Sequence, residues 1–169
     1  MKNYGAQRGK IAQMFPEFDD ATIDRINDAY YLAFPGVKEY HDYCYRIAVL
    51  QSFATNLFGV KYFGVSGHNL INMLVQGSAA YFLKWKICQV AAYLEEHHCK
   101  STFQMQIHDE LSFEWHEDDD PQVFFDIKEI MEDWSDGLVP IIADMELTTT
   151  NWAEKVEVHS YEEFETQSA

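Results

Sequence analysis

Residues 104–115, with the sequence QMQIHDELSFEW, place His108, Asp109 and Glu110 between two runs of alternating apolar and polar side chains. A carboxylate at the tip of a β-hairpin is open to solvent and substrate, while the paired strands fix its position. Mg²⁺ needs only one or two protein carboxylates when substrate phosphates complete its coordination. Aspartate is also common in ordinary turns. The tripeptide is therefore compatible with a metal site or a solvated turn, and taken alone it favours the turn.

A second set of polar residues follows helical spacing. His68, Asn72 and Gln76 are four residues apart in an otherwise apolar stretch, so they share one helix face. Asn and Gln both donate and accept hydrogen bonds, as contacts to base edges and sugars in a minor groove require. The alternative is a helix with a few hydrogen-bonded polar positions, and the spacing alone favours this alternative.

Composition limits the class of protein. The 169 residues fit one domain or part of a larger one. The sequence has neither an apolar run of about 20 residues nor an apolar signal segment, so no membrane span or secretion is expected. Three scattered cysteines without CxxC spacing favour a reducing cytoplasm over a disulfide framework or a zinc site. We therefore expect a cytoplasmic protein.

The net charge of −16 is unevenly distributed. Residues 1–108 carry ten basic and nine acidic side chains, whereas residues 109–169 carry two basic and nineteen acidic ones. Phosphate binding favours Lys and Arg. The first two thirds of the chain thus remain able to meet a polyanion, and the acidic charge belongs to the last third.

Apolar periodicity predicts an α+β fold, with a small antiparallel sheet covered on one face by helices. A long helix is expected at 68–97, and a strong hairpin signal falls on either side of residues 108–110. In that hairpin, Phe103, Met105 and Ile107 alternate with polar residues. The other expected elements are helices at 9–15, 16–34, 35–54 and 120–137, a short hairpin or loop at 55–67, a strand at 139–152 and a loosely held polar tail at 153–169.

Several stretches together resemble the family A DNA polymerases. QIHDELSFE is similar to the family's motif C, and HNLINMLVQGSAAYFLK resembles its helix carrying Asn and Gln, with His in place of the common Arg. AFPGVKEY resembles its YPGV helix start, TNLFGVKYF its Gly-basic loop, and NYGAQRGKIAQ the second half of its motif B. TTTNW resembles the family's C-terminal ending. These stretches follow the family's order over residues 2–152.

The resemblance assigns roles to the residues of the predicted hairpin tip. It makes Asp109 one of the two metal-binding aspartates of a two-metal mechanism, in which two Mg²⁺ ions position the primer 3′-hydroxyl and the triphosphate. It makes Glu110 an auxiliary carboxylate. It places His108 beside the primer terminus, where the imidazole orients the sugar-phosphate.

The resemblance also implies contacts to DNA and nucleotide. Tyr4 and Gly5 would end the fingers helix beside the templating base and the incoming dNTP. Four residues would follow the primer–template: Lys61, His68, Asn72 and Gln76. Reading in the minor groove is degenerate, which suits an enzyme that accepts every base pair.

By the same resemblance, residues 1–50 are the C-terminal remnant of the fingers, 51–152 the palm, and 153–169 an acidic C-terminal tail. Motif A, which supplies the other metal-binding aspartate, is absent, because EFDDATIDR follows motif B and has helical character. One aspartate cannot hold both metals. We therefore expect the C-terminal subunit of a split DNA-directed DNA polymerase of phage type, active in DNA replication only when a partner chain supplies the thumb, motif A and the start of motif B.

Two alternatives remain open at this stage. The chain could be a non-catalytic palm-fold remnant that acts as an acidic protein-interaction module, which the missing motif A and the acidic tail favour. It could also be a fragment of an intact enzyme. Asp109, Asn72 and Gln76 argue against the interaction module, because such a module needs none of the three.

Overall fold

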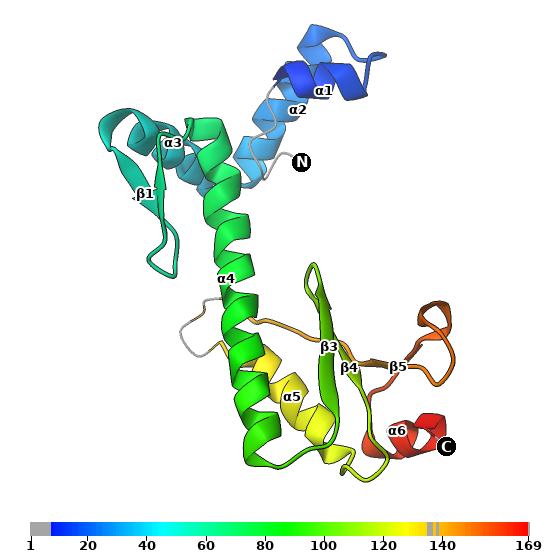
Figure 1. Cartoon of the computed structure of the whole chain (residues 1–169). Coiled ribbons are helices and arrows are strands. Elements are labelled where there is room, and N and C mark those ends of the chain that lie inside the picture. Colours follow the sequence, from blue (N-terminus) through cyan, green and yellow to red (C-terminus); the bar gives the residue numbers. More distant parts are fainter. Residues whose placement is uncertain (1–7, 135–136, 138, 169) are drawn as a thin grey trace. The chain divides into compact units, whose positions relative to one another are not determined.

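The protein is described here by a computed structural model that covers residues 8–134, 137 and 139–168. It forms two compact units, Met1–Phe82 and Leu83–Ala169 (Figure 1). The first unit contains α1 (Arg8–Met14), α2 (Asp20–Ala33), α3 (Pro35–Leu50), β1 (Phe53–Thr55), β2 (Lys61–Phe63) and the start of α4 (Gly67–Glu96). The second unit contains the rest of α4, β3 (Thr102–Ile107), β4 (Glu110–Glu114), α5 (Gln122–Glu132), β5 (Glu146–Leu147), the 3-10 helix η2 (Trp152–Glu154), β6 (Val156–Glu157) and α6 (Tyr161–Ser168).

Local chemistry explains the helix boundaries of the first unit. The Asp19 side chain accepts a hydrogen bond from the backbone N–H of Thr22 at 2.8 Å, which caps α2 at its N-terminus. Pro35 occupies the first turn of α3, where its missing N–H costs nothing. The helices predicted at 9–15, 16–34 and 35–54 are confirmed, although the third ends at Leu50 because residues 53–55 form β1.

The core of the first unit lies between α3, the β1–β2 hairpin and the beginning of α4. Its buried residues are Cys44, Ile47, Ala54, Leu70, Ile71 and Leu74. Gly77 lets the hairpin approach α4, because a Cβ at this position would lie 2.1 Å from the Tyr62 hydroxyl oxygen. Ser78 then donates to the Leu74 carbonyl at 2.5 Å and accepts from the Leu57 N–H at 3.3 Å. The small side chains of the long helix therefore hold the short hairpin in place.

The core of the second unit lies between the C-terminal half of α4, α5 and the β3–β4 hairpin. Val90 and Leu94 of α4 pack with Val123 and Ile127 of α5. Phe113 of β4 meets Phe124 of α5 edge to face, with ring centroids 5.6 Å apart. The prediction of an α+β fold is confirmed, although the strands of the described residues form three separate two-stranded antiparallel sheets instead of one.

The prediction of a loosely held tail at 153–169 is wrong. β6 pairs with β5 in antiparallel register, Glu146 opposite Glu157 and Leu147 opposite Val156. Val158 and Phe164 are buried, at 3% and 4% exposure. The mostly polar and acidic composition of this segment hid these two apolar anchors, so the last residues form a packed part of the second unit (Figure 1).

The strand predicted at 139–152 is also shorter than expected. Of these residues only Glu146 and Leu147 are in a strand, and Val139 and Ile142 remain exposed. Lys128 of α5 donates from its Nζ to the Ala143 carbonyl at 2.5 Å, and the Glu132 carboxylate accepts from the Ala143 N–H at 2.9 Å. These side-chain bonds to α5 replace the strand ladder that the apolar run predicted.

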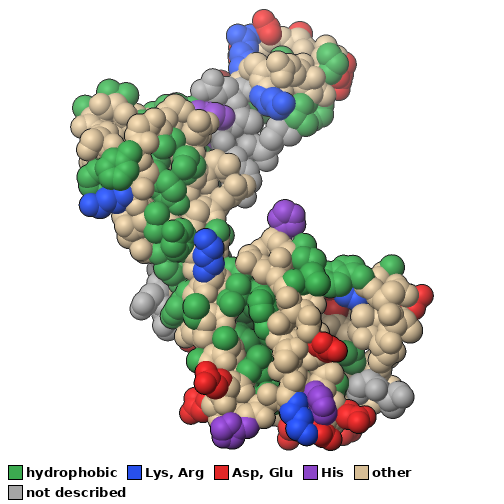
Figure 2. Space-filling view, in the orientation of Figure 1, with side chains coloured by type: hydrophobic (Ala, Val, Ile, Leu, Met, Phe, Trp, Pro, Cys, Tyr) green, Lys and Arg blue, Asp and Glu red, His purple; other side chains and the backbone are tan. Residues whose placement is uncertain are grey.

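Several large hydrophobic side chains of the first unit are exposed. Figure 2 shows hydrophobic side chains exposed on the first unit, over the region of α3 and the β1–β2 hairpin. Val49, Leu50 and Phe63 in this region are 83%, 72% and 65% exposed. Within the described ranges, no helix has the length and apolar character needed to cross a membrane.

Candidate active-site hairpin

The predicted hairpin around Asp109 is present, with a turn of two residues. Ile107 and Glu110 are the last paired residues, so His108 and Asp109 form the loop. His108 has φ of 53°, which lies in the left-handed region that tight hairpin turns require and that histidine adopts more readily than most residues. The Gln106 amide Nε2 donates to the His108 carbonyl at 2.9 Å. The turn thus presents the Asp109 side chain at the hairpin tip.

A β-bulge at Gln104 changes the faces of β3. Phe103 pairs with Phe113, and Met105 pairs with Ser112, so one extra residue lies in β3. Phe103 consequently lies on the same face as Phe113, and their ring centroids are 5.7 Å apart. The alternation of Phe103, Met105 and Ile107 in the sequence therefore does not put these three side chains on one face. Met105 and Ile107 face away from Phe103 and remain 48% and 40% exposed.

Asp109 is exposed and available to a ligand. Among the described residues no hydrogen bond or ion pair involves its carboxylate, and no group of three or more His, Cys, Asp or Glu there could hold a metal ion. An exposed carboxylate of this kind fits Mg²⁺, which accepts one or two protein carboxylates and takes its other oxygen ligands from water and phosphate. At the hairpin turn the described residues thus offer one exposed carboxylate of this kind, that of Asp109.

Glu110 has a different environment from its neighbour. Lys155 reaches it from the segment before β6, with Nζ 2.8 Å from Glu110 Oε1 and 2.5 Å from Glu146 Oε2. The same Nζ lies 4.4 Å from the centroid of the Trp152 ring. The hydrogen bond to Glu110 and, to a lesser extent, the one to Glu146 raise the pKa of Lys155 above its ordinary value, so the side chain stays charged.

Sequence reasoning missed Lys155 as a residue of this site. One signal was present, since Lys155 is one of only two basic side chains in residues 109–169. Each of two lysines among nineteen carboxylates has many candidate partners, however. Only the packing of β6 beside β5 selects Glu110 and Glu146 among them.

The three polar residues of α4 form one stripe, as predicted. His68 and Gln76 are exposed and Asn72 is half-buried. They lie on the side of α4 away from the buried Leu70 and Leu74. Asn72 Oδ1 is buried and has no hydrogen-bond partner among the described residues, so it keeps its capacity for a ligand.

The remaining predicted contacts have different outcomes. Lys61 of β2 is exposed, and its Nζ lies 4.5 Å from the centroid of the Phe53 ring. Tyr4 and Gly5 lie outside the described residues. The α4 stripe and Lys61 belong to the first unit, whereas His108, Asp109 and Glu110 belong to the second.

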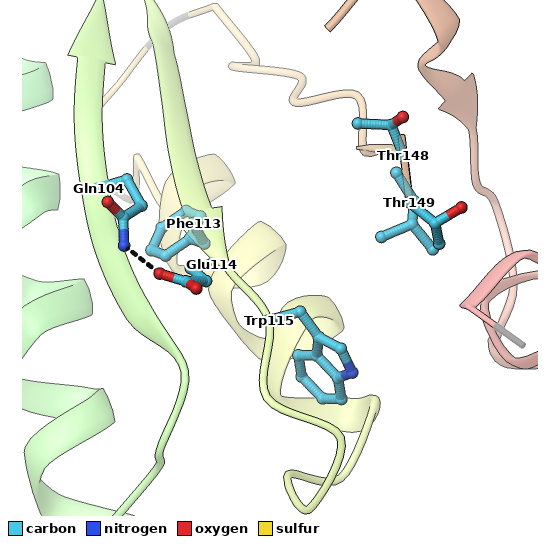
Figure 3. A pocket seen from close by; sticks show the side chains of 7 residues that line it. Gln104, Phe113, Glu114, Trp115, Thr148 and Thr149 are labelled. Carbon is cyan, nitrogen blue, oxygen red and sulfur yellow. Dashed lines mark hydrogen bonds between the residues drawn. The ribbon is translucent and has the colours of Figure 1, made fainter. Parts of the chain in front are cut away.

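A pocket of about 470 Å³ lies between the hairpin and the residues that follow β5 (Figure 3). Phe113, Glu114 and Trp115 form one side, and Thr148 and Thr149 face them. Its one lining carboxylate, that of Glu114, accepts a hydrogen bond from the Gln104 amide at 2.8 Å. The pocket therefore does not include Asp109 and is separate from the candidate metal ligand.

Comparison with known proteins shows which family the chain belongs to. The family model of DNA polymerase family A matches residues 3–154. The chain therefore belongs to DNA polymerase family A, as the motifs around Asp109 and along α4 predict.

Individual relatives support the same family. The chain is 30% identical over 135 residues to the DNA polymerase DpoZ of Salmonella phage PMBT28, a match that spans 76% of this chain and 21% of the relative. It is 29% identical over 137 residues to the DNA polymerase I of Caldicellulosiruptor bescii, spanning 74% of this chain and 16% of the relative. The chain thus spans about a fifth of these relatives or less.

The fold resembles the POL domain of Pol1 from M. smegmatis, a structure of a complex with DNA primer-template and dNTP. The TM-score is 0.71 at 21% sequence identity, over 78% of this chain and 25% of that chain. This likeness confirms the fold, that of a polymerase domain.

Proposed function

We propose that the chain is the C-terminal subunit of a split family A DNA-directed DNA polymerase. Its part in nucleotidyl transfer is the motif C aspartate, Asp109, and the contacts that hold the primer–template. The observation that carries this proposal is the exposed Asp109 carboxylate at the tip of a short hairpin, inside a segment that matches the family over 152 residues.

In this proposal each residue has one task. Asp109 holds Mg²⁺ through its carboxylate, and His108, next to it in the turn, orients the primer terminus. Bound Mg²⁺ would neutralise charge on the triphosphate during in-line displacement by the primer 3′-hydroxyl. His68, Asn72 and Gln76 contact the minor groove, and the unpartnered Asn72 Oδ1 supports this role. Lys61 contacts the DNA backbone through its charge.

A second polypeptide completes the enzyme in this proposal. Two-metal sites hold both ions through shared carboxylates, and no group of three or more His, Cys, Asp or Glu among the described residues could hold a metal ion. The partner supplies motif A, the start of motif B and the thumb. The phage polymerase among the relatives supports an enzyme of phage type. Residues 1–50 are then the end of the fingers, and residues 51–152 form the palm.

Reconstitution tests the proposal. The chain is mixed with the candidate N-terminal polymerase fragment from the same genome, and Mg²⁺-dependent primer extension is measured with each chain alone and with both. We expect extension only from the mixture. Asp109→Asn should lower its rate by about two orders of magnitude or more, which corresponds to about 2.7 kcal/mol or more of lost transition-state stabilisation. Asp144→Asn, an exchange of the same kind outside the site, is the matched control.

Two results would contradict the proposal. Extension that is unaffected by Asp109→Asn would remove Asp109 from the catalytic site. Binding of the fragment without extension, unchanged by Asp109→Asn, would support the alternative of a non-catalytic interaction module.

A further inference from the structure

The C-terminal residues make two contacts with the catalytic hairpin that lie outside the family match. The match ends at residue 154, and residues 155–168, which we call the strap, follow it. At one end of the strap, Lys155 binds Glu110, the residue next to Asp109. At the other end, Phe164 packs on Trp115, just past the end of β4, with ring centroids 5.1 Å apart. The strap therefore contacts the hairpin at its tip and at its base.

Between these two contacts, the residues that follow β5 are separated from β4 by a pocket. β6 of the strap pairs with β5, and the pocket of about 470 Å³ separates the residues after β5 from Phe113 and Glu114 of β4 (Figure 3). Of the two contacts, only the one at Lys155 lies beside the candidate metal ligand. The charge and position of Lys155 can therefore affect which ions bind at the hairpin tip.

The ion pair engages the carboxylate that is closest in sequence to Asp109. The Lys155 side chain is 18% exposed and the Glu110 side chain 41% exposed, so water screens the pair only in part. Glu146 and the Trp152 ring hold the same ammonium group from other sides, at 2.5 Å and 4.4 Å. Three neighbours therefore fix Lys155 in the position from which it binds Glu110.

We propose that Lys155 is a positioning residue, which holds Glu110 in the ion pair and thereby leaves Asp109 as the sole carboxylate of the hairpin tip that binds the divalent ion. This inference rests on the proposed role of Asp109 as a metal ligand. Glu110 on this account supports the hairpin instead of acting as an auxiliary metal ligand. The strap, through Lys155, thereby sets the number of carboxylates that this subunit contributes to the site.

The first measurement concerns the hairpin alone and needs no partner. Amide hydrogen exchange of the whole chain is followed by NMR in wild type, Lys155→Met and Glu146→Gln. Lys155→Met should speed the exchange of the β3–β4 amides about two- to fivefold, the range for a partly exposed ion pair. Glu146→Gln keeps the Lys155–Glu110 contact and should change these rates less. Equal rates in wild type and Lys155→Met would overturn the claim that Lys155 holds the hairpin.

The second measurement concerns the metal. Mn²⁺ is titrated into the chain, and paramagnetic broadening of the Asp109 and Glu110 amide signals gives a site-specific affinity. Lys155→Met should tighten Mn²⁺ binding about tenfold, because a released carboxylate near 5 Å adds roughly 1–2 kcal/mol of attraction to a divalent ion in water. Lys155→Arg keeps the ion pair and should restore the wild-type affinity.

A double variant separates coordination by Glu110 from the mere loss of a positive charge. If released Glu110 joins the ion, the gain of Lys155→Met disappears when Glu110→Gln is added. A gain of equal size in the Glu110→Gln background would overturn the inference. Asp109→Asn tests the proposed function separately. If Mn²⁺ still broadens the hairpin signals in this variant, Asp109 is not a metal ligand. The hydrogen-exchange result for Lys155 does not depend on that outcome.

Discussion

Removal of the Phe164 side chain tests whether the C-terminal residues are part of the folded second unit. Phe164 is 4% exposed, and its ring lies 5.1 Å from that of Trp115 and 5.9 Å from that of Phe124. A buried Phe→Ala exchange costs about 3–5 kcal/mol, and each aromatic pair accounts for about 0.5–1.5 kcal/mol of that. Since α6 is a short helix of eight residues, it can detach, which limits the loss to its docking free energy. We expect a loss of about 2–4 kcal/mol.

Urea unfolding, followed by near-ultraviolet circular dichroism and tryptophan fluorescence, measures this loss. Thr166→Ala on an exposed position of the same helix is the matched control and should change the free energy of unfolding by less than about 0.5 kcal/mol. If Phe164→Ala also changed it by less than about 0.5 kcal/mol, Phe164 would not be packed on Trp115 and Phe124. The original expectation of a loose tail would then be right.

Three further exchanges test other parts of the structure. Gly77→Ala should cost about 1–3 kcal/mol in urea unfolding, because its Cβ would displace the Tyr62 hydroxyl, whereas Gly36→Ala, whose Cβ meets nothing within 4 Å, should be neutral or stabilising. Burial raises the pKa of Asp119, but hydrogen bonds from backbone N–H groups lower it by more, so the pKa lies below its ordinary value. The ionised carboxylate therefore stabilises the fold above about pH 4, and this stabilisation is lost as the pH falls through the folded-state pKa. The free energy of unfolding should therefore fall less steeply below about pH 4 in Asp119→Asn than in wild type, and equal slopes would contradict this. At the hairpin turn, His108→Gly should keep or raise stability and His108→Val should lower it by about 1–2 kcal/mol, since φ is positive there; equal melting temperatures would refute the turn geometry.

The hairpin shows how far local pattern carries a prediction. Alternation on both sides of His108 and Asp109 correctly placed two antiparallel strands. The same alternation does not reveal the face of Phe103, because a β-bulge at Gln104 shifts the register by one residue. A bulge of this kind depends on how Phe103 packs against Phe113, and period-two alternation carries no information on that contact.

The long helix α4 was the most predictable element of the fold. Its apolar length and the four-residue spacing of His68, Asn72 and Gln76 gave both its extent and its polar stripe. The close approach that Gly77 permits depends on tertiary packing, because the structure places the Tyr62 hydroxyl of the short hairpin beside it.

Candidate site residues that depend on tertiary contacts could not be found from the sequence. Asp109 was found because its neighbours in sequence form a motif. Lys155 was not found, because its partners Glu110 and Glu146 are 45 and nine residues away and only the β5–β6 pairing brings them together.

One measurement tests the central claim most directly, the coordination of the divalent ion by Asp109. Crystals of the chain with its partner subunit, primer–template and dNTP are grown with Mn²⁺, and the ion is located by its anomalous scattering. We predict an ion within about 2.2 Å of an Asp109 carboxylate oxygen, with a second carboxylate supplied by the partner subunit. An ion held entirely by carboxylates of the partner subunit, with Asp109 in solvent, would contradict the account.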